Sequence, residues 1–234
     1  LLAADTPVVT LVGKSHSAQV INVLETTLQE NLAMLSDSIS YLKSKGRVVF
    51  FDAEHFFDGF KSDKEYAMQS LRVAIEAGAD SVALCDTNGG MLPADIDSIV
   101  KAVRQETSAD IGIHCHNDAD MAVANTIAAV QAGVSHVQGT INGYGERCGN
   151  ANLISIVANL KLKMGIDCMS SSQLSSLTQT SYYIGEIVNV HPNNSQPYVG
   201  TRAFTHKGGI HVAAINKMEE SYQHVDPSVI GNTK

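Results

Sequence analysis

The sequence predicts an α/β protein built on a parallel sheet, and it favours a (β/α)8 barrel over a doubly wound sheet. Two observations support this. Five apolar, β-branched segments alternate with segments of helical spacing along the chain. Polar side chains also stand at the carboxyl end of each of these five segments. A barrel collects such groups around one rim, whereas a doubly wound sheet concentrates them at one switch point.

Each expected strand is followed by a segment with helical spacing. The strands are expected at 8–15, 47–54, 81–90, 111–118 and from 136 into a glycine-rich loop that ends at 150. The helices are expected at 23–46, 62–79, 93–107, 121–134 and 153–165. Gly46 is a natural helix end, Pro93 a favoured first-turn residue, and Ser62 with Glu65 has the spacing of a capping box. Five strands cannot close an eight-stranded barrel, so a barrel requires three more strands than this chain supplies.

The character of the sequence changes after about Gly165. One more amphipathic helix is expected at 171–190, then a linker rich in proline and asparagine at 191–200, then a small mixed segment at 203–232. We therefore expect a partial barrel domain over residues 1–190 and a linker with a C-terminal subdomain over residues 191–234.

Composition excludes several functional classes. The net charge is −8 and the basic residues are scattered, which argues against a nucleic-acid partner. No apolar stretch approaches the roughly 20 residues that a membrane span needs, and the first residues lack the features of a secretory signal. The four cysteines stand far apart, which suggests free thiols in a reducing cytoplasm.

Two histidines mark the end of the fourth expected strand. His114 and His116 are two residues apart, so their side chains share one face of the strand while Cys115 points to the other. At a barrel mouth two imidazoles can bind one divalent ion, with oxygen ligands and water completing the site. The spacing alone leaves open two hydrogen-bonded histidines without a metal.

The loop after the fifth strand, "GTINGYGERCGNANL", is rich in glycine. Glycines let a backbone approach a ligand closely, and Glu146, Arg147 and Asn150 supply the polar groups. Taken alone, the loop is equally compatible with a turn that carries a surface ion pair.

Together these motifs resemble a known family. "GIHCHND" followed by "GTINGYGERCGNANL" is similar to the citramalate, 2-isopropylmalate and homocitrate synthases, whose barrel is shared with hydroxymethylglutaryl-CoA lyase. "DAEHFFDGFKSDKEYA", "LCDTNGG", "AFTHKGGIHV" and "SYQHVDPSVIGN" look most like the citramalate synthase branch. The resemblance covers essentially the whole chain and the motifs fall in family order.

The resemblance implies a reaction and roles for individual residues. Acetyl-CoA is enolised and condenses with a 2-oxo acid, and the thioester is then hydrolysed. His114, His116 and Asn150 would hold a divalent metal, Mg²⁺ or Mn²⁺, with Zn²⁺ as an alternative. Thr87 would bind the carboxylate of the oxo acid, and Gly145, Glu146 and Asn150 would also line the substrate side.

The resemblance also implies the groups that move protons. Glu54 faces the acetyl group, and His211 and Tyr222 reach toward the acetyl-CoA side of a barrel, often that of a partner subunit. Whether Glu54 or His211 is the base stays open. Without the resemblance, Glu54 would be equally well read as a solvated strand-end residue and His211 as a surface histidine.

One departure from the family pattern concerns the first strand. The family carries an Asp-x-Thr-Leu-Arg-Asp-Gly motif there, whose aspartate binds the metal and whose arginine stabilises the oxyanion. No such motif occurs here, and the chain begins at the family's fourth strand. We therefore expect strands 4–8 only, and a fragment that is inactive by itself. A second departure follows Asp118, where "ADM" replaces the usual small or apolar residues.

The favoured hypothesis is an acyltransferase that makes (R)-citramalate from pyruvate and acetyl-CoA in branched-chain amino-acid biosynthesis, as a cytoplasmic homodimer. The neighbouring alternatives are 2-isopropylmalate and homocitrate synthases. A lyase on the same scaffold and an inactive fragment are the alternatives from other classes.

Overall fold

The computed structural model describes residues 2–233, and these form two compact units. The first unit runs to Gly139 and takes in Gly145–Ala151. The second consists of Thr140–Tyr144 and the chain from Asn152 onward. The division between the two compact units falls within the loop after the fifth strand. The expected domain boundary near residue 190 stays a prediction.

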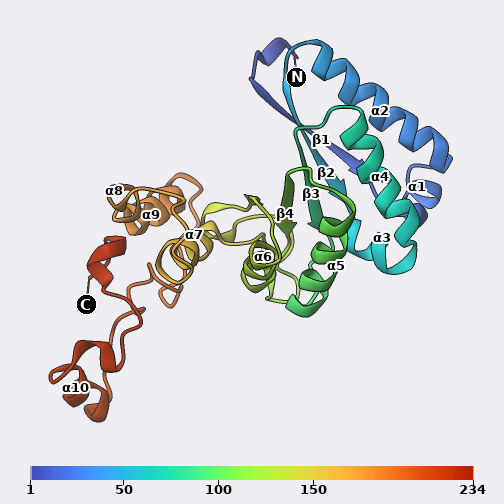
Figure 1. Ribbon diagram of the computed structural model, residues 1–234. Helices are drawn as coiled ribbons and strands as arrows, with labels where there is room; N and C mark the ends of the chain where they lie inside the picture. The colour runs from blue at the N-terminus through green and yellow to red at the C-terminus, as the bar shows by residue number, and fades with distance from the viewer. Residues whose placement is uncertain (1, 234) are drawn as a thin grey trace. The chain divides into compact units, whose positions relative to one another are not determined.

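The first unit contains a sheet of five parallel strands (Figure 1). The strands are β1 (Val8–Lys14), β2 (Val48–Glu54), β3 (Ser81–Asp86), β4 (Ile111–Cys115) and β5 (His136–Gln138). Their order in the sheet is β1-β2-β3-β4-β5, so every strand lies beside the strands that precede and follow it in the sequence. A doubly wound sheet would reverse its order at a switch point. The sequential order therefore agrees with the barrel prediction.

The helices of the first unit cover one face of this sheet, with α2, α4, α5 and α6 along the same side of the strands in Figure 1. Right-handed crossovers between successive parallel strands place them there. The helices are α1 (Ser17–Asn22), α2 (Leu28–Ser44), α3 (Phe56–Ser62), α4 (Lys64–Glu76), α5 (Pro93–Glu106) and α6 (Ala122–Gln131), after a short 3-10 turn at Leu2–Ala4. The core between sheet and helices includes the fully buried Phe51, Phe57, Leu71 and Ile113.

The opposite face of the sheet is concave. Gln138 on β5 donates a hydrogen bond of 2.7 Å to Asp52 on β2, although β3 and β4 lie between them. Strands are about 4.8 Å apart, so a flat sheet would separate these two backbones by about 14 Å, beyond the reach of the two side chains. The contact therefore requires the curvature of a barrel wall, and it places polar side chains on the inner face.

Three local predictions are corrected by the structure. The expected helix at 23–46 begins only at Leu28, because Glu25 has a positive φ of 53° and Thr27 caps the new helix. The capping box at Ser62 does not form, because Ser62 ends α3 and the Asp63 side chain accepts the N–H of Tyr66 instead. The helix expected at 171–190 is divided into two helices by Ser175 and Ser176.

In the part of the chain that the structure describes, the regular elements of the second unit are helices, joined by segments without regular structure. It contains α7 (Leu153–Leu162), α8 (Ser171–Leu174), α9 (Leu177–Ile187) and α10 (Gly209–Ile215), with 3-10 turns at Ile141–Gly143, Glu219–Ser221 and Pro227–Ile230. Its core joins α7, α8 and α9 to the chain beyond 197, through Ile154, Leu174, Leu177, Tyr198, Phe204 and Ile230.

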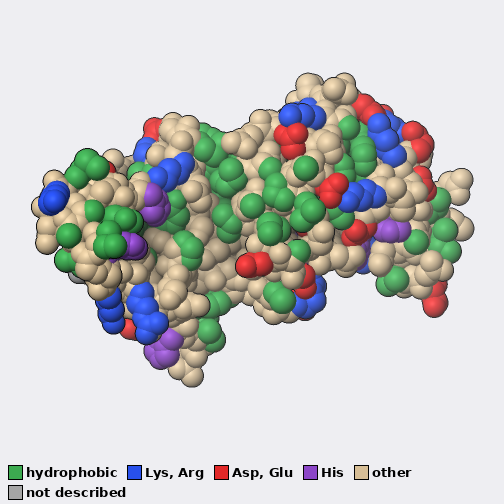
Figure 2. All heavy atoms as spheres, turned by 90° about the horizontal axis from the view of Figure 1, so that it is seen from below, with side chains coloured by type: hydrophobic (Ala, Val, Ile, Leu, Met, Phe, Trp, Pro, Cys, Tyr) green, Lys and Arg blue, Asp and Glu red, His purple; other side chains and the backbone are tan. Residues whose placement is uncertain are grey.

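Charged side chains of both signs share the surface of the first unit, as Figure 2 shows for one face. An example is the network in which Arg72 pairs with Glu65 and Glu106, and Lys64 also reaches Glu106. Among residues 2–233, no helix combines the length and apolar character needed to cross a membrane.

Candidate functional site

The first unit gathers most of the predicted site residues at the carboxyl edge of its sheet. Glu54 ends β2, Thr87 follows β3, and His114 lies one residue before the end of β4. His116 and Asn150 face one another in an isolated antiparallel bridge, which brings the loop after β5 back to the end of β4. Four separate segments of sequence thus meet at one rim, as the strand-end pattern predicts.

The two histidines lie together, as the alternation of strand side chains predicts. The rings of His114 and His116 have centroids 5.1 Å apart, with 54° between their planes. Cys115 between them is buried in the opposite direction, toward the helices. Nδ1 of His114 is 2.9 Å from Oε1 of Gln138. Burial lowers the pKa of His116, and the neighbouring His114 adds to the effect, which favours a neutral ring with a free lone pair.

Two buried polar atoms beside this pair have no hydrogen-bond partner. They are Nδ1 of His116 and Oδ1 of Asn150. Buried polar atoms are nearly always paired, so two orphaned atoms in one place indicate a ligand. Two imidazoles and an amide oxygen are donors that divalent transition metals and Mg²⁺ accept. The residues present therefore fit a divalent ion, although residues 2–233 contain no cluster of three or more His, Cys, Asp or Glu side chains with metal-site geometry.

The loop from Gly145 to Ala151 is held by an ion pair and hydrogen bonds to the residues that follow β3 and β4. Arg147 makes a bidentate ion pair with Asp118, at 2.7 and 2.8 Å, and also donates to the carbonyl oxygen of Thr87 at 2.8 Å. The N–H of Asn117 bonds the carbonyl of Gly149 at 2.9 Å. The sequence suggested a surface ion pair for this loop, but it gave no indication that Asp118 was the partner. Glu146 is exposed.

The position of the Asn150 side chain depends on the absence of a side chain at Gly145. A Cβ atom at Gly145 would lie 2.9 Å from Oδ1 of Asn150 and 3.0 Å from its Cγ. These distances are shorter than carbon normally tolerates, so only glycine fits here without displacing the amide. Gly145 thus acts on the site through Asn150.

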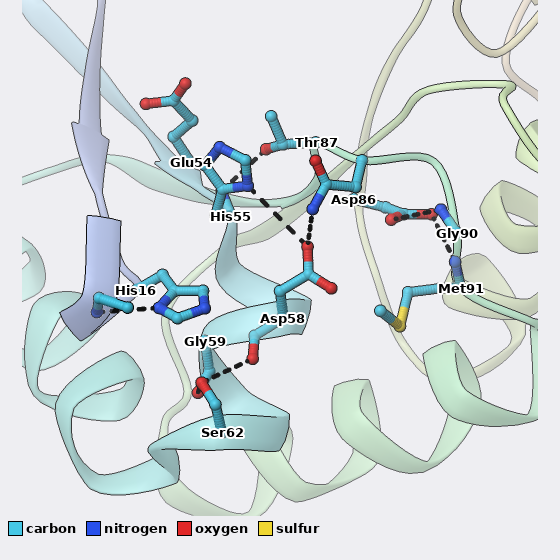
Figure 3. Close-up of polar contacts among 12 residues, drawn as sticks. His16, Glu54, His55, Asp58, Gly59, Ser62, Asp86, Thr87, Gly90 and Met91 are labelled. Atoms are coloured by element: carbon cyan, nitrogen blue, oxygen red, sulfur yellow. Dashed lines mark hydrogen bonds and ion pairs between the residues drawn. The ribbon is translucent and has the colours of Figure 1, made fainter. Parts of the chain in front are cut away.

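Thr87 is held from two sides. Its Oγ1 accepts the backbone N–H of His55 at 2.8 Å, and its carbonyl accepts Arg147. Since the oxygen already accepts this bond, the hydroxyl hydrogen is available to donate elsewhere. Figure 3 shows Thr87 beside Glu54 and His55, with Asp86 next to it in the chain. The buried Asp86 carboxylate accepts the N–H groups of Gly90 and Met91 at 3.2 Å each, which shapes the turn that presents Thr87.

Glu54 is paired across the sheet. Its Oε2 lies 2.6 Å from Nζ of Lys14, its register partner on β1. The next residue, His55, has a positive φ of 58°, which is uncommon for a residue other than glycine. Nδ1 of His55 is 3.9 Å from Asp58, which also accepts a bond of 2.7 Å from Asn88. Sequence reasoning missed both Lys14 as the partner of Glu54 and the turn at His55.

His211 and Tyr222 lie together in the second unit. Their rings are stacked, with centroids 4.1 Å apart and 18° between the planes. His206 completes a group of three rings, 6.1 Å from His211 and 6.3 Å from Tyr222. Tyr222 remains 44% exposed, so this group has a face open to a ligand or a partner.

The family model described as HMGL-like matches residues 2–184, which is most of the chain. The chain belongs to the HMGL-like family. A second model, described as a homocitrate synthase post-HMGL domain-like segment, matches residues 198–234 of this HMGL-like protein. The resemblance inferred from the motifs is confirmed, and the barrel class with it.

Curated relatives of this HMGL-like chain include an (R)-citramalate synthase from Streptomyces coelicolor, which is 54% identical over 233 residues. The match covers 100% of this chain and 44% of the relative, so the chain spans less than half the length of that protein. A 2-isopropylmalate synthase from Sulfolobus acidocaldarius is 37% identical over 89% of the chain and 53% of the relative.

A solved structure with the same fold is an HMG-CoA lyase from Acinetobacter baumannii in complex with coenzyme A and 3-methylmalate. Its TM-score is 0.71 at 18% identity, over 88% of this chain and 70% of that one. At this identity the likeness concerns the fold alone.

Proposed function

We propose that this chain belongs to the catalytic domain of an acyltransferase that condenses acetyl-CoA with pyruvate to give (R)-citramalate. The observation that carries the proposal is the pair of orphaned buried atoms, on His116 and Asn150, beside His114. It is supported by five curated (R)-citramalate synthases that are 48–54% identical over 99–100% of the chain. The 2-isopropylmalate and homocitrate synthases are more distant, at 34–38%.

His114, His116 and Asn150 are the residues that would hold the divalent ion, Mg²⁺ or Mn²⁺ in this proposal, with Zn²⁺ as the alternative. When bound, the ion supplies a Lewis acid that polarises the carbonyl group of the oxo acid. Thr87 donates its free hydroxyl hydrogen to the carboxylate of the oxo acid, and it is oriented for this by His55 and Arg147. Gly145 and Glu146 line the same side of the site.

Glu54 is the proposed base, which takes a proton from the methyl group of the acetyl thioester. A base must be positioned before it can act, and the ion pair with Lys14 fixes the carboxylate at the strand end. His211 and Tyr222 contribute an imidazole and a phenol to the same proton movements. The stacked arrangement holds both rings in one orientation.

We further propose that the enzyme is a cytoplasmic homodimer in which His211 and Tyr222 serve the site of the neighbouring subunit. The exposed face of this ring pair supports the idea, as does the proline- and asparagine-rich linker at 191–200. Sedimentation of the purified protein tests the dimer. A monomer with full activity would contradict it.

The substrate is tested by steady-state kcat/KM for pyruvate and 2-oxoisovalerate, with acetyl-CoA as the second substrate, in protein that contains this chain. We expect pyruvate to be favoured by more than the roughly 10–200-fold that lost methylene contacts provide, because a pocket that excludes an isopropyl group acts by steric exclusion. Equal or higher efficiency with 2-oxoisovalerate would make the protein a 2-isopropylmalate synthase. Cleavage of a hydroxyacyl-CoA without condensation would make it a lyase.

A further inference from the structure

Gln138 links two other polar side chains on the concave face of the sheet. Its Nε2 donates to Oδ1 of Asp52 at 2.7 Å, and its Oε1 lies 2.9 Å from Nδ1 of His114. Gln138 is the register partner of His114 on the neighbouring strand, whereas Asp52 is on β2, 86 residues away in the sequence. The three side chains form a continuous chain of hydrogen bonds that ends at a proposed metal ligand.

Small residues stand in register with Asp52 on the two strands between it and Gln138. Its register partner on β3 is Ala83, whose partner on β4 is Gly112. A Cβ at Gly112 would lie 3.0 Å from the Cβ of Ala83 and 3.0 Å from Nδ1 of His136.

The direction of the hydrogen bonds follows from chemistry. An ionised carboxylate can only accept, so the amide NH₂ group of Gln138 must face Asp52. Its carbonyl oxygen is then the end that faces His114, and an oxygen of this kind also only accepts. Nδ1 of His114 must therefore carry the hydrogen, and in the neutral ring Nε2 then carries the lone pair.

We propose that Asp52 and Gln138 are positioning residues that fix the tautomer of His114 and so assign Nε2 as its metal-binding atom. Outer groups of this kind orient a ligand ring and make it a better donor. The inference rests on the proposed function in treating His114 as a ligand. The tautomer itself is a property of the chain that exists without any metal.

The first test is the tautomer of His114 in the metal-free protein with EDTA, read from the ¹⁵N chemical shifts of the imidazole nitrogens and assigned with His114→Gln. We expect hydrogen on Nδ1 in the unsubstituted protein. Gln138→Leu should lose this preference, because nothing then accepts the hydrogen. Gln138→Glu should keep it, because a carboxylate still accepts from Nδ1. Hydrogen on Nε2 in the unsubstituted protein, or an unchanged tautomer in Gln138→Leu, would overturn the inference.

The second test is calorimetric titration with Mn²⁺ of the same substitutions in protein that contains this chain. We expect Gln138→Leu to bind about 10–100-fold more weakly, as is typical when an outer partner of a metal ligand is lost. Gln105→Leu, at an exposed glutamine on α5, is the matched control and should bind normally. Equal affinity of Gln138→Leu and the unsubstituted protein would count against the relay. If the unsubstituted protein binds no Mn²⁺, the proposed metal role fails, while the tautomer measurement still decides the inference.

Discussion

Lys14 and Glu54 form a cross-strand ion pair of 2.6 Å at the carboxyl ends of β1 and β2. Both side chains are mostly covered, with 16% and 28% of their surfaces exposed. The pair links the edge strand of the sheet to the proposed base. The pair is therefore a contact between two strands and also a contact to the proposed base. Substitution of Lys14 tests its effect on stability, and substitution of Glu54 tests its effect on catalysis.

Removal of Lys14 should weaken the fold modestly. We expect Lys14→Met to lower the free energy of unfolding by about 1 kcal/mol, and a double-mutant cycle with Glu54→Gln to give a coupling of about 0.5–1 kcal/mol. The exposed pair Lys101–Asp97 on α5 is the control, and its cycle should give about 0.3–0.5 kcal/mol. Urea unfolding measures both cycles. A coupling no larger than that of the control would show that burial adds nothing to this pair.

Glu54→Gln should affect turnover far more than it affects stability. Loss of a general base typically costs about 10²–10⁴-fold in rate. We expect a fall in kcat of that order in protein containing this chain, with little change in the KM for the oxo acid, because Thr87 and the metal ligands are untouched. A variant that keeps more than a tenth of the normal kcat would remove Glu54 from the role of base.

Stability should fall as the pH is lowered below neutrality, and His136 contributes to this. His136 is half-buried, with its Nδ1 3.3 Å from Ser81 and its ring 4.8 Å from that of Phe50. Burial lowers the pKa of His136 below its ordinary value of 6.5, against the opposing effects of Asp52 and Asp110. Between the two pKa values the unfolded chain binds more protons. The contribution is therefore full above about pH 6.5 and is lost as the pH falls through the folded pKa.

The measurement is urea unfolding between pH 7.5 and 5.5 in EDTA. We expect His136→Gln to lose less stability over this interval than the unsubstituted protein, while His191→Gln, at an exposed histidine, behaves like the parent. Burial raises the pKa of Asp52 and of Asp86 above their ordinary value of 3.8. These two carboxyl groups therefore change stability in the opposite direction, because the stability that they contribute decreases as the pH rises from 3.8 through the folded pKa. The difference between variant and parent removes the contribution of Asp86 and leaves that of His136 together with its interaction with Asp52. A steeper fall in His136→Gln would reverse the assigned sign.

The loop after β4 contains an unusual backbone position at Asp120, whose φ is +59°. Asp tolerates this region, helped here by the Asn117 amide, which bonds Oδ1 of Asp120 at 3.3 Å. We expect Asp120→Gly to change the free energy of unfolding by less than about 0.5 kcal/mol, because relief of strain offsets the greater freedom of the unfolded chain. Asp120→Val should cost about 1–3 kcal/mol. Asp97→Val on α5 is the control for a β-branched residue at an ordinary helical position.

Much of the first unit was predictable because its determinants are local. Alternating apolar segments and the positions of strand-end polar residues gave the five parallel strands, and alternation along β4 placed His114 and His116 on one face. The two-residue spacing works because a strand has a side-chain period of two. The helix starts were less predictable. α3 follows directly from the left-handed turn at His55, and such a turn is uncommon even at histidine, which adopts it more often than most residues do.

The contacts that complete the site were not predictable from spacing. The Asp52–Gln138 bond and the Arg147–Asp118 pair join residues 86 and 29 positions apart. Both depend on the curvature of the sheet and on the path of one loop, which are consequences of the assembled unit. The sequence identified Arg147 as a polar group of the loop, but its patterns gave no reason to single out Gln138 or Asp118, whose partners are determined by the fold.

The same dependence on close packing leads to a prediction for Gly145. A methyl group there would stand 2.9 Å from Oδ1 of Asn150, so Gly145→Ala should push the amide away from its present rotamer. An off-rotamer side chain costs about 0.5–1.5 kcal/mol, which corresponds to roughly 2–12-fold weaker metal binding if Asn150 is a ligand. The control is Gly90→Ala, where no atom lies within 4 Å of the added methyl group. Titration with Mn²⁺ compares the two variants, and urea unfolding checks that both remain folded. Unchanged affinity in a folded Gly145→Ala protein would exclude Asn150 from the metal site, whereas a similar loss in Gly90→Ala would show that the effect does not come from the Asn150 contact.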